Sequence, residues 1–151
     1  MWNHTFLSDR IKNSSAITPT AGVAGTTPIE GAGLDTAGFD GVLMRARFGA
    51  ITANAVTSIK AQQSDDDGVA DAYSDIEGTS QTVADDDDGE TFMIDIVRPT
   101  KRYVRLYVSR GTQNAVVAEA SYFQYGAKDL PVTQPTGVTV EQFVSPAEGT
   151  A

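Results

Sequence analysis

The sequence predicts an all-β protein: an antiparallel β-sandwich or jelly-roll-like module with extended N- and C-terminal arms. Apolar and polar residues alternate with a period of two in several segments, Asp-Gly pairs typical of tight turns occur between them, and no 3.6-residue period is sustained. A chain of 151 residues has the length of one domain. We therefore predict an arm at residues 1–33, a β-sandwich domain at 34–130 and a tail at 131–151.

The N-terminal arm is predicted from its composition. Its large apolar side chains lie near its start, at Trp2, Phe6, Leu7 and Ile11, and we expect these four to anchor it on a neighbouring surface. From residue 13 to 33 the chain consists mainly of Ser, Thr, Ala, Gly and Pro. Such a segment buries too little apolar surface to offset its ordering entropy alone. We expect it to lie extended and to become ordered against a partner.

Five segments between the arms have the alternation of half-buried strands. In residues 102–109, Val104, Leu106 and Val108 form an apolar face, and the residues between them form an amphipathic one. The last segment is rich in Val, Tyr and Phe, which favour strands. The predicted strands are residues 41–50, 57–63, 91–97, 102–109 and 116–125.

The connections and the tail are weaker signals. Asp-Gly pairs at residues 40–41, 67–68 and 88–89 predict turns. Residues 69–76 are compatible with a single helical turn. The tail contains three prolines and one apolar group that fits an extra edge strand, formed by Val138, Val140, Phe143 and Val144.

Charge and composition exclude several classes of protein. The net charge of −9 argues against binding to nucleic acid or to an anionic membrane surface, because both need a basic face. The chain has no cysteine, which excludes disulfides and thiolate zinc sites. Neither a secretory signal nor an apolar run of the roughly 20 residues that a membrane helix needs is visible.

The residues give little support for catalysis. His4 is the only histidine and lies in the predicted arm, so a Ser-His-Asp triad is not expected. No phosphate-binding glycine motif occurs. The acidic turns leave open an irregular calcium site with Asp65, Asp67, Asp85 and Asp87, although their spacing does not fit an EF-hand. We expect no enzyme activity and no cofactor, and regard solvated acidic loops as the principal alternative to a metal site.

Arginine and tyrosine residues on predicted strands form a second candidate interface. Both residue types are enriched in protein interfaces, because they combine a large contact area with polar tips. The alternative is that they make ordinary cross-strand pairs with nearby aspartates. The residues concerned are Arg45, Arg47, Arg102, Tyr103, Arg105 and Tyr107.

Part of the chain resembles small structural proteins of tailed phages and prophages. The resemblance extends over about residues 34–121 and rests on four short motifs, LDTAGFD at 34–40, FGAIT at 48–52, QQSDDDG at 62–68 and KRYVR at 101–105. Two features depart from the pattern: the second aspartate run is longer, and Tyr73 replaces a more common tryptophan. The two arms have no counterpart.

Proteins of this kind are head-decoration or cement components. The resemblance implies a non-enzymatic β-sandwich that binds the major capsid protein on the outer surface of the phage head, and we expect a homo-oligomer, a dimer or a trimer. One alternative is another virion component, in the neck, the tail or the fibre attachment. A second alternative is a calcium- or carbohydrate-binding β-module, in which Tyr103, Tyr107, Tyr122 and Tyr125 would form a platform for sugar stacking.

Overall fold

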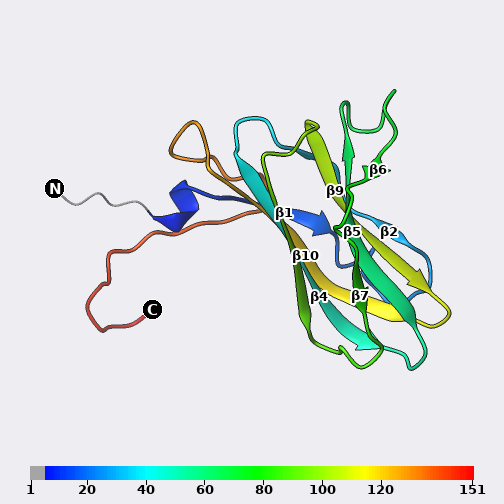
Figure 1. Ribbon diagram of the computed structural model, residues 1–151. Coiled ribbons are helices and arrows are strands. Elements are labelled where there is room, and N and C mark those ends of the chain that lie inside the picture. The colour runs from blue at the N-terminus through cyan, green and yellow to red at the C-terminus, as the bar shows by residue number, and fades with distance from the viewer. Residues whose placement is uncertain (1–5) are drawn as a thin grey trace.

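The computed structural model describes residues 6–151 and is an antiparallel β-sandwich (Figure 1). The predicted all-β sandwich is confirmed, whereas the finer jelly-roll description is not. The described residues contain no α-helix, only a 3₁₀ turn, η1 (Leu7–Asp9). None of the helices in this part of the chain is long and apolar enough to span a membrane.

Two sheets face each other. Sheet A has the order β1 (Lys12–Ile17), β10 (Ala115–Tyr125), β4 (Gly41–Ile51) and β8 (Thr91–Val97). Sheet B has the order β2 (Ile29–Glu30), β9 (Tyr103–Gly111), β5 (Val56–Ser64) and β6 (Ser74–Asp75). In addition, β3 (Leu34–Asp35) pairs with β9, and β7 (Gln81–Val83) pairs with β5.

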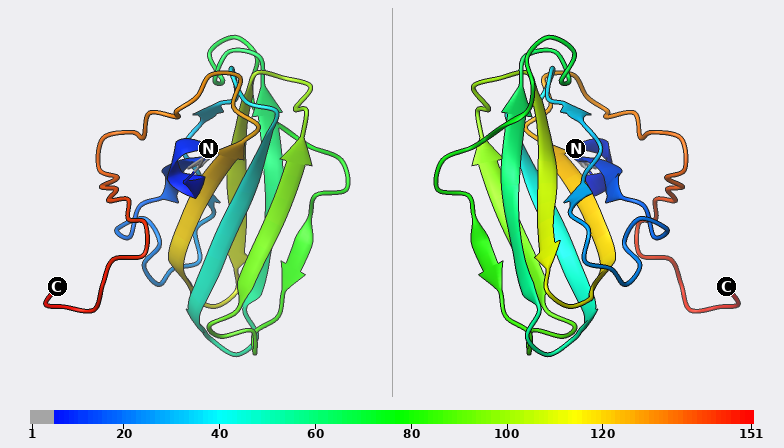
Figure 2. Two further views of the ribbon diagram at one scale, coloured as in Figure 1. Left: turned by 90° about the vertical axis from the view of Figure 1, so that its left-hand side faces the viewer. Right: turned by 90° about the vertical axis from the view of Figure 1, so that its right-hand side faces the viewer.

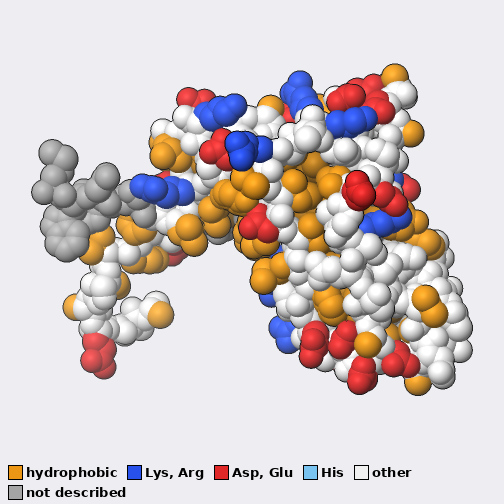
Figure 3. All heavy atoms as spheres, in the orientation of Figure 1, with side chains coloured by type: hydrophobic (Ala, Val, Ile, Leu, Met, Phe, Trp, Pro, Cys, Tyr) orange, Lys and Arg blue, Asp and Glu red, His pale blue; other side chains and the backbone are white. Residues whose placement is uncertain are grey.

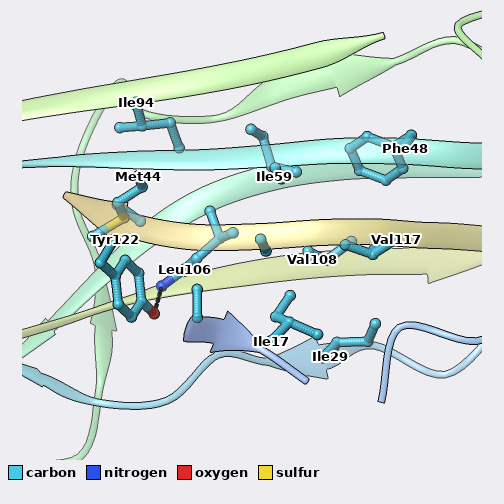
Figure 4. Packing of buried hydrophobic residues seen from close by; sticks show 14 of the residues in the cluster. Ile17, Ile29, Met44, Phe48, Ile59, Ile94, Leu106, Val108, Val117 and Tyr122 are labelled. Atoms are coloured by element: carbon cyan, nitrogen blue, oxygen red, sulfur yellow. Dashed lines mark hydrogen bonds between the residues drawn. The ribbon is translucent and has the colours of Figure 1, made fainter. Parts of the chain in front are cut away.

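The core forms where the apolar faces of the alternating strands meet. All five predicted strands are present, and their observed ends lie within one or two residues of the predicted ones. Met44 and Phe48 from β4 and Ile59 from β5 are fully buried between the sheets (Figure 4). The ring of Phe48 meets Phe92 edge-on, with centroids 5.7 Å apart. Period-two alternation is therefore sufficient to place the long strands.

The N-terminal segment differs from the predicted arm. Residues 12–17 form an edge strand of sheet A, and Ala16 and Ile17 belong to the core. Ile29 is also buried, and the two residues of β2 pair with β9. The tail does lie outside both sheets, and the extra edge strand proposed for it is absent from the described chain. Residues 69–76 form bends and the short strand β6, not a helical turn.

Arg110 explains how a segment with few apolar residues is held. This side chain is only 8% exposed. Its Nε donates to the carbonyl of Thr27 at 2.7 Å, and its Nη1 donates to the carbonyls of Val23 and Ala115 at 2.7 and 2.8 Å. Burial lowers the pKa of Arg110. One guanidinium thus replaces the missing apolar contacts in the loop between β1 and β2.

Tyr122 connects the two sheets. Between β2 and β3, residues 31–33 interrupt the ladder with β9. At this interruption the Leu106 N–H of β9 donates to the buried Tyr122 hydroxyl at 2.8 Å (Figure 4). The same hydroxyl donates to the carbonyl of Ala32 at 2.8 Å, and the Ala32 N–H donates to Ala16 of β1 at 2.8 Å. A Cβ on Gly31 would lie 2.7 Å from the hydroxyl oxygen, so only glycine fits there.

Replacing Tyr122 with phenylalanine is expected to destabilise the protein by about 1–3 kcal/mol, because the buried Leu106 N–H loses its acceptor. For a chain of this size each kcal/mol lowers the melting temperature by roughly 2–4 °C. Thermal unfolding followed by circular dichroism measures the change. Tyr125→Phe is the matched control, since its hydroxyl bonds at the surface. Equal losses in the two variants would contradict this role of Tyr122.

Arg110→Lys is expected to loosen the loop between β1 and β2, because an ammonium group cannot reproduce the planar fork of the guanidinium. Amide hydrogen exchange across residues 18–28 should become at least about tenfold faster, while exchange in β4 and β10 stays unchanged. Arg47→Lys is the control, since Arg47 is exposed and makes one such bond, to Gly89. Unaltered exchange in the loop would show that Arg110 does not hold it.

Candidate interaction surface

The outer face of sheet A carries an apolar groove of about 530 Å³. Leu43 of β4, with Phe123 and Tyr125 of β10, forms its floor, and Leu7 and Ile11 close one side. Phe123 and Leu43 are direct cross-strand partners, so their side chains lie together. Figure 3 shows apolar side chains on the projecting chain ends and where these ends join the sandwich. An open apolar hollow on a sheet face is typical of a surface that binds a partner.

Tyr125 sets the shape of the groove. Its ring lies over Gly41 of the neighbouring strand, where a Cβ would come within 2.4 Å of the ring. Its hydroxyl donates to Asp95 Oδ1 of β8 at 2.7 Å. This hydrogen bond, with a smaller contribution from burial, raises the pKa of Tyr125 to about 12. The Tyr125 side chain thus extends from β10 across β4 to β8 and forms part of the floor of the groove.

The two ends of the described chain are joined beside this groove (Figure 2). The Val132 N–H donates to the carbonyl of Asp9 at 2.8 Å. The Gln134 amide bonds to residues 8, 11 and 13, and Gln142 Nε2 donates to Ser8 and Asp9 at 2.9 and 2.7 Å. We call residues 6–13 and 131–142 together the clasp. The clasp fixes residues 6–13, whose Leu7 and Ile11 line the groove, against the C-terminal segment.

The predicted anchor residues have different positions. Leu7 and Ile11 line the groove, and Leu7 is 68% exposed. Phe6 precedes η1 and is half-buried, whereas Trp2 lies outside the described residues. Sequence reasoning missed Leu43 and Phe123 as surface residues. The sequence does contain a signal for them. Each is an apolar residue on the outer face of its strand, and the two strands, β4 and β10, pair with each other.

The arginine and tyrosine residues of the second candidate interface lie on two opposite faces. Arg45 and Arg47 are on the outer face of sheet A, where Arg45 pairs with Glu119 at 2.7 Å. The other four residues belong to the outer side of sheet B or its rim. They do not form one continuous surface.

On sheet B these side chains have intramolecular partners. Arg105 binds both carboxylate oxygens of Glu30 at 3.0 and 3.1 Å and lies 4.2 Å from the ring centroid of Tyr73. Arg102 makes a bidentate pair with Asp35. Lys60 lies 4.9 Å from the ring centroid of Tyr107, and Arg102 lies 5.4 Å from that of Tyr103. The pair of Arg102 with Asp35 is the pairing with an aspartate that the alternative interpretation describes, and Arg105 pairs in the same way with a glutamate.

The aspartates of both runs accept backbone N–H groups at turns. Asp66 Oδ1 accepts the N–H groups of Val69 and Asp71, both at 3.1 Å, and Oδ2 accepts that of Ala70 at 2.8 Å. In the second run, Asp88 accepts the Ile51 N–H at 2.7 Å, and Asp85 and Asp87 accept those of residues 54 and 84. Asp66 and Asp87 thus satisfy N–H groups of their own turns, whereas Asp85 and Asp88 satisfy those of the turn between β4 and β5.

The candidate calcium ligands are not brought together. Asp65 follows one end of β5, whereas Asp85 follows β7, which pairs with the other end. Within residues 6–151 no group of three or more acidic or histidine side chains is placed to hold a metal ion. The proposed sugar platform is also dispersed, because Tyr122 is buried in the core and Tyr125 lies on the opposite sheet from Tyr103 and Tyr107.

Asp66→Asn is expected to lower the melting temperature at pH 7, because the asparagine NH₂ would face the Ala70 N–H. Hydrogen bonds from Ala70 and Asp71 hold the pKa of Asp66 below its ordinary value of 3.8. The unfolded state therefore binds more protons, so this stabilisation is complete at neutral pH and is lost as the pH falls below about 4. The difference from wild type should shrink towards pH 3 in thermal unfolding.

Asp86→Asn is the matched control for Asp66→Asn. It removes one charge from the second run, where Asp85, Asp87 and Asp88 accept the backbone N–H groups. A small, similar effect of both substitutions would indicate that only charge matters. A difference for Asp66→Asn that does not change with pH would contradict the capping role of its carboxylate.

Comparison with known protein families and with curated proteins found no match to this chain. The geometry of the surface itself therefore carries the functional argument. That geometry is an apolar groove on one sheet face, bordered by the N-terminal segment of the clasp. The acidic residues of the sandwich cap turns and pair with neighbouring cations.

Proposed function

We propose that the protein is a bacteriophage capsid decoration (cement) protein, a non-enzymatic module that binds the outer surface of the major capsid lattice and stabilises the head. The observation that carries the proposal is the apolar groove lined by Leu7, Ile11, Leu43, Phe123 and Tyr125, together with the clasp beside it. The resemblance of residues 34–121 to phage structural proteins supports the same class.

The energetics of such a role fit this surface. A stable protein contact buries roughly 800 Å² per partner, an area that the groove and the projecting chain ends can supply together. Leu7, Phe143 and Val144 are each more than 60% exposed and are available for burial. Burial of such a side chain contributes about 1.5–3 kcal/mol. Many copies on one lattice, or an oligomer over a symmetry axis, add avidity without further contacts.

Charge supports the orientation. The net charge of −9 makes decorated particles repel one another. The Asp85–Asp88 turn lies at the end of the sandwich where β4 meets β5, away from the end that carries the clasp (Figure 1). In the proposed arrangement the groove and the clasp face the shell, and this acidic end faces the solvent.

The other proposed classes gain less support. A neck, tail or fibre-attachment component would use the same module, and copy number distinguishes it, because a decoration protein approaches the abundance of the major capsid protein. The calcium- or sugar-binding module loses its basis, since its aspartates and tyrosines are dispersed over the fold.

Leu7→Asp is expected to weaken binding to undecorated phage heads by at least about tenfold. Losing the burial of one leucine costs about 1.5–3 kcal/mol, and 1.4 kcal/mol corresponds to a factor of ten. Co-sedimentation of the purified protein with heads over a concentration series measures the change. A point substitution is preferred to deleting the first thirty residues, which would remove β1 from sheet A.

Val56→Asp is the matched control for Leu7→Asp. Val56 is 66% exposed, close to the 68% of Leu7, but it begins β5 at the opposite end of the sandwich. It should bind heads like the wild type. Equal binding by all three proteins would remove the groove from the mechanism, and no binding by the wild type would remove the decoration function.

A further inference from the structure

The edge of β1 that faces away from β10 is occupied by a side-chain amide. The Asn13 N–H donates to Gln134 Oε1 at 3.0 Å, and Gln134 Nε2 donates to the carbonyl of Ile11 at 2.6 Å. A residue of a neighbouring parallel strand would make the same two bonds with its own N–H and carbonyl. Beyond residue 15 the edge is covered, because the Ala16 carbonyl accepts the Ala32 N–H. Residues 11–15 are therefore a short strand edge held by one glutamine.

The tail contains a segment with the character of a strand that is not paired. Residues 138–144, VTVEQFV, are rich in β-branched and aromatic residues, which favour strands. Val140, Phe143 and Val144 are 41%, 64% and 63% exposed. The segment belongs to neither sheet. Its apolar side chains lack the burial that their residue types favour.

A turn separates this segment from the edge within the same molecule. The Val138 N–H donates to the carbonyl of Pro135 at 3.2 Å, and Gly137 has a φ of +94°, so the chain reverses directly after Gln134. The tail then passes over β1 with an imperfect fit. A cavity of about 370 Å³ remains beneath it, and the buried Oδ1 of Asn13, which lines this cavity, has no hydrogen-bond partner.

We propose that residues 138–144 of one copy pair with the β1 edge, residues 11–15, of a second copy and displace Gln134 from it. The inference rests on the homo-oligomer of the proposed function but not on binding to the shell. Each chain supplies one donor segment and one acceptor edge, so reciprocal exchange gives a dimer, and exchange around a symmetry axis gives a ring. Seven extended residues span roughly 23 Å, enough to cover the five-residue edge.

Charge favours the same pairing between copies. After Lys128 the chain has no basic residue, and the donor segment carries Glu141, with Glu148 following it. The acceptor edge contains Lys12, and Arg10 precedes it. Val138 and Val140 already lie beside Ile11 and Phe123 in their own chain, around a second cavity of about 330 Å³. The exchanged segment would meet the same apolar residues and would add the ladder hydrogen bonds.

The absence of cysteine from the chain allows a direct test. Ser15→Cys, at the acceptor edge, is mixed with a second preparation that carries Val140→Cys or Gln142→Cys. In an extended strand these two donor positions point to the same face as Val138, the face that Ser15 shares with Ile11 and Phe123. After oxidation we expect a disulfide between the two preparations, read as a covalent dimer on a denaturing gel. A disulfide requires Cα atoms within about 7 Å, so random collisions contribute little.

The control replaces Ser15→Cys with Thr82→Cys, an exposed position on β7 at the edge of sheet B, and should give no covalent dimer with the same donors. Removing residues 138–151 should convert the oligomer to a monomer by light scattering. A variant that carries the acceptor and a donor cysteine in one chain is oxidised separately. A disulfide within that one chain, or no mixed disulfide with either donor, would overturn the proposal. Binding of the same variants to heads is measured separately, so failure of the exchange is distinguishable from failure of the decoration function.

Discussion

The fold depends on one buried hydroxyl group. Sheet B has a gap where residues 31–33 leave the ladder, and the Leu106 N–H in that gap is too deeply buried to be hydrated. Tyr122 reaches across from sheet A, accepts that N–H and donates to Ala32. Burial raises the pKa of Tyr122 well above its ordinary value, so the phenol stays protonated and keeps both roles. Without this contact, the buried Leu106 N–H would lack an acceptor and the Ala32 carbonyl would lose its donor.

The long strands were predictable because their signal is local. Alternation places Met44, Ile59 and Leu106 on the core side whatever their partners are. The segment before residue 34 was not predictable in this way. It is held by Arg110 and by the close approach of Gly31 to Leu106, and in both cases the acceptor is a backbone carbonyl, which has no sequence signature. A composition poor in apolar residues therefore indicated an arm where the molecule has an edge strand.

The candidate surface was predictable only in part. Leu7 and Ile11 stood out because they are isolated apolar residues in a polar segment. Leu43 and Phe123 belong to strands whose opposite face fills the core, and their apolar character was absorbed into that interpretation. The joining of the two chain ends depends on glutamines more than 120 residues away from their partners, a distance over which spacing carries no information. The aspartate runs are the reverse case: their pattern is conspicuous and suggests a ligand site, although their carboxylates accept backbone N–H groups at turns.

The clasp also has a mechanical consequence for the molecule. Both chain ends leave the sandwich together, while the short turn at residues 112–114 between β9 and β10 is at the opposite end. A load transmitted through the ends enters β1 and β10, which are adjacent antiparallel strands, so their ladder would open one hydrogen bond at a time from that end. The far turn would carry no tension. A peptide inserted at residues 112–114 would therefore point away from the clasp, and force applied through the chain ends would not reach it.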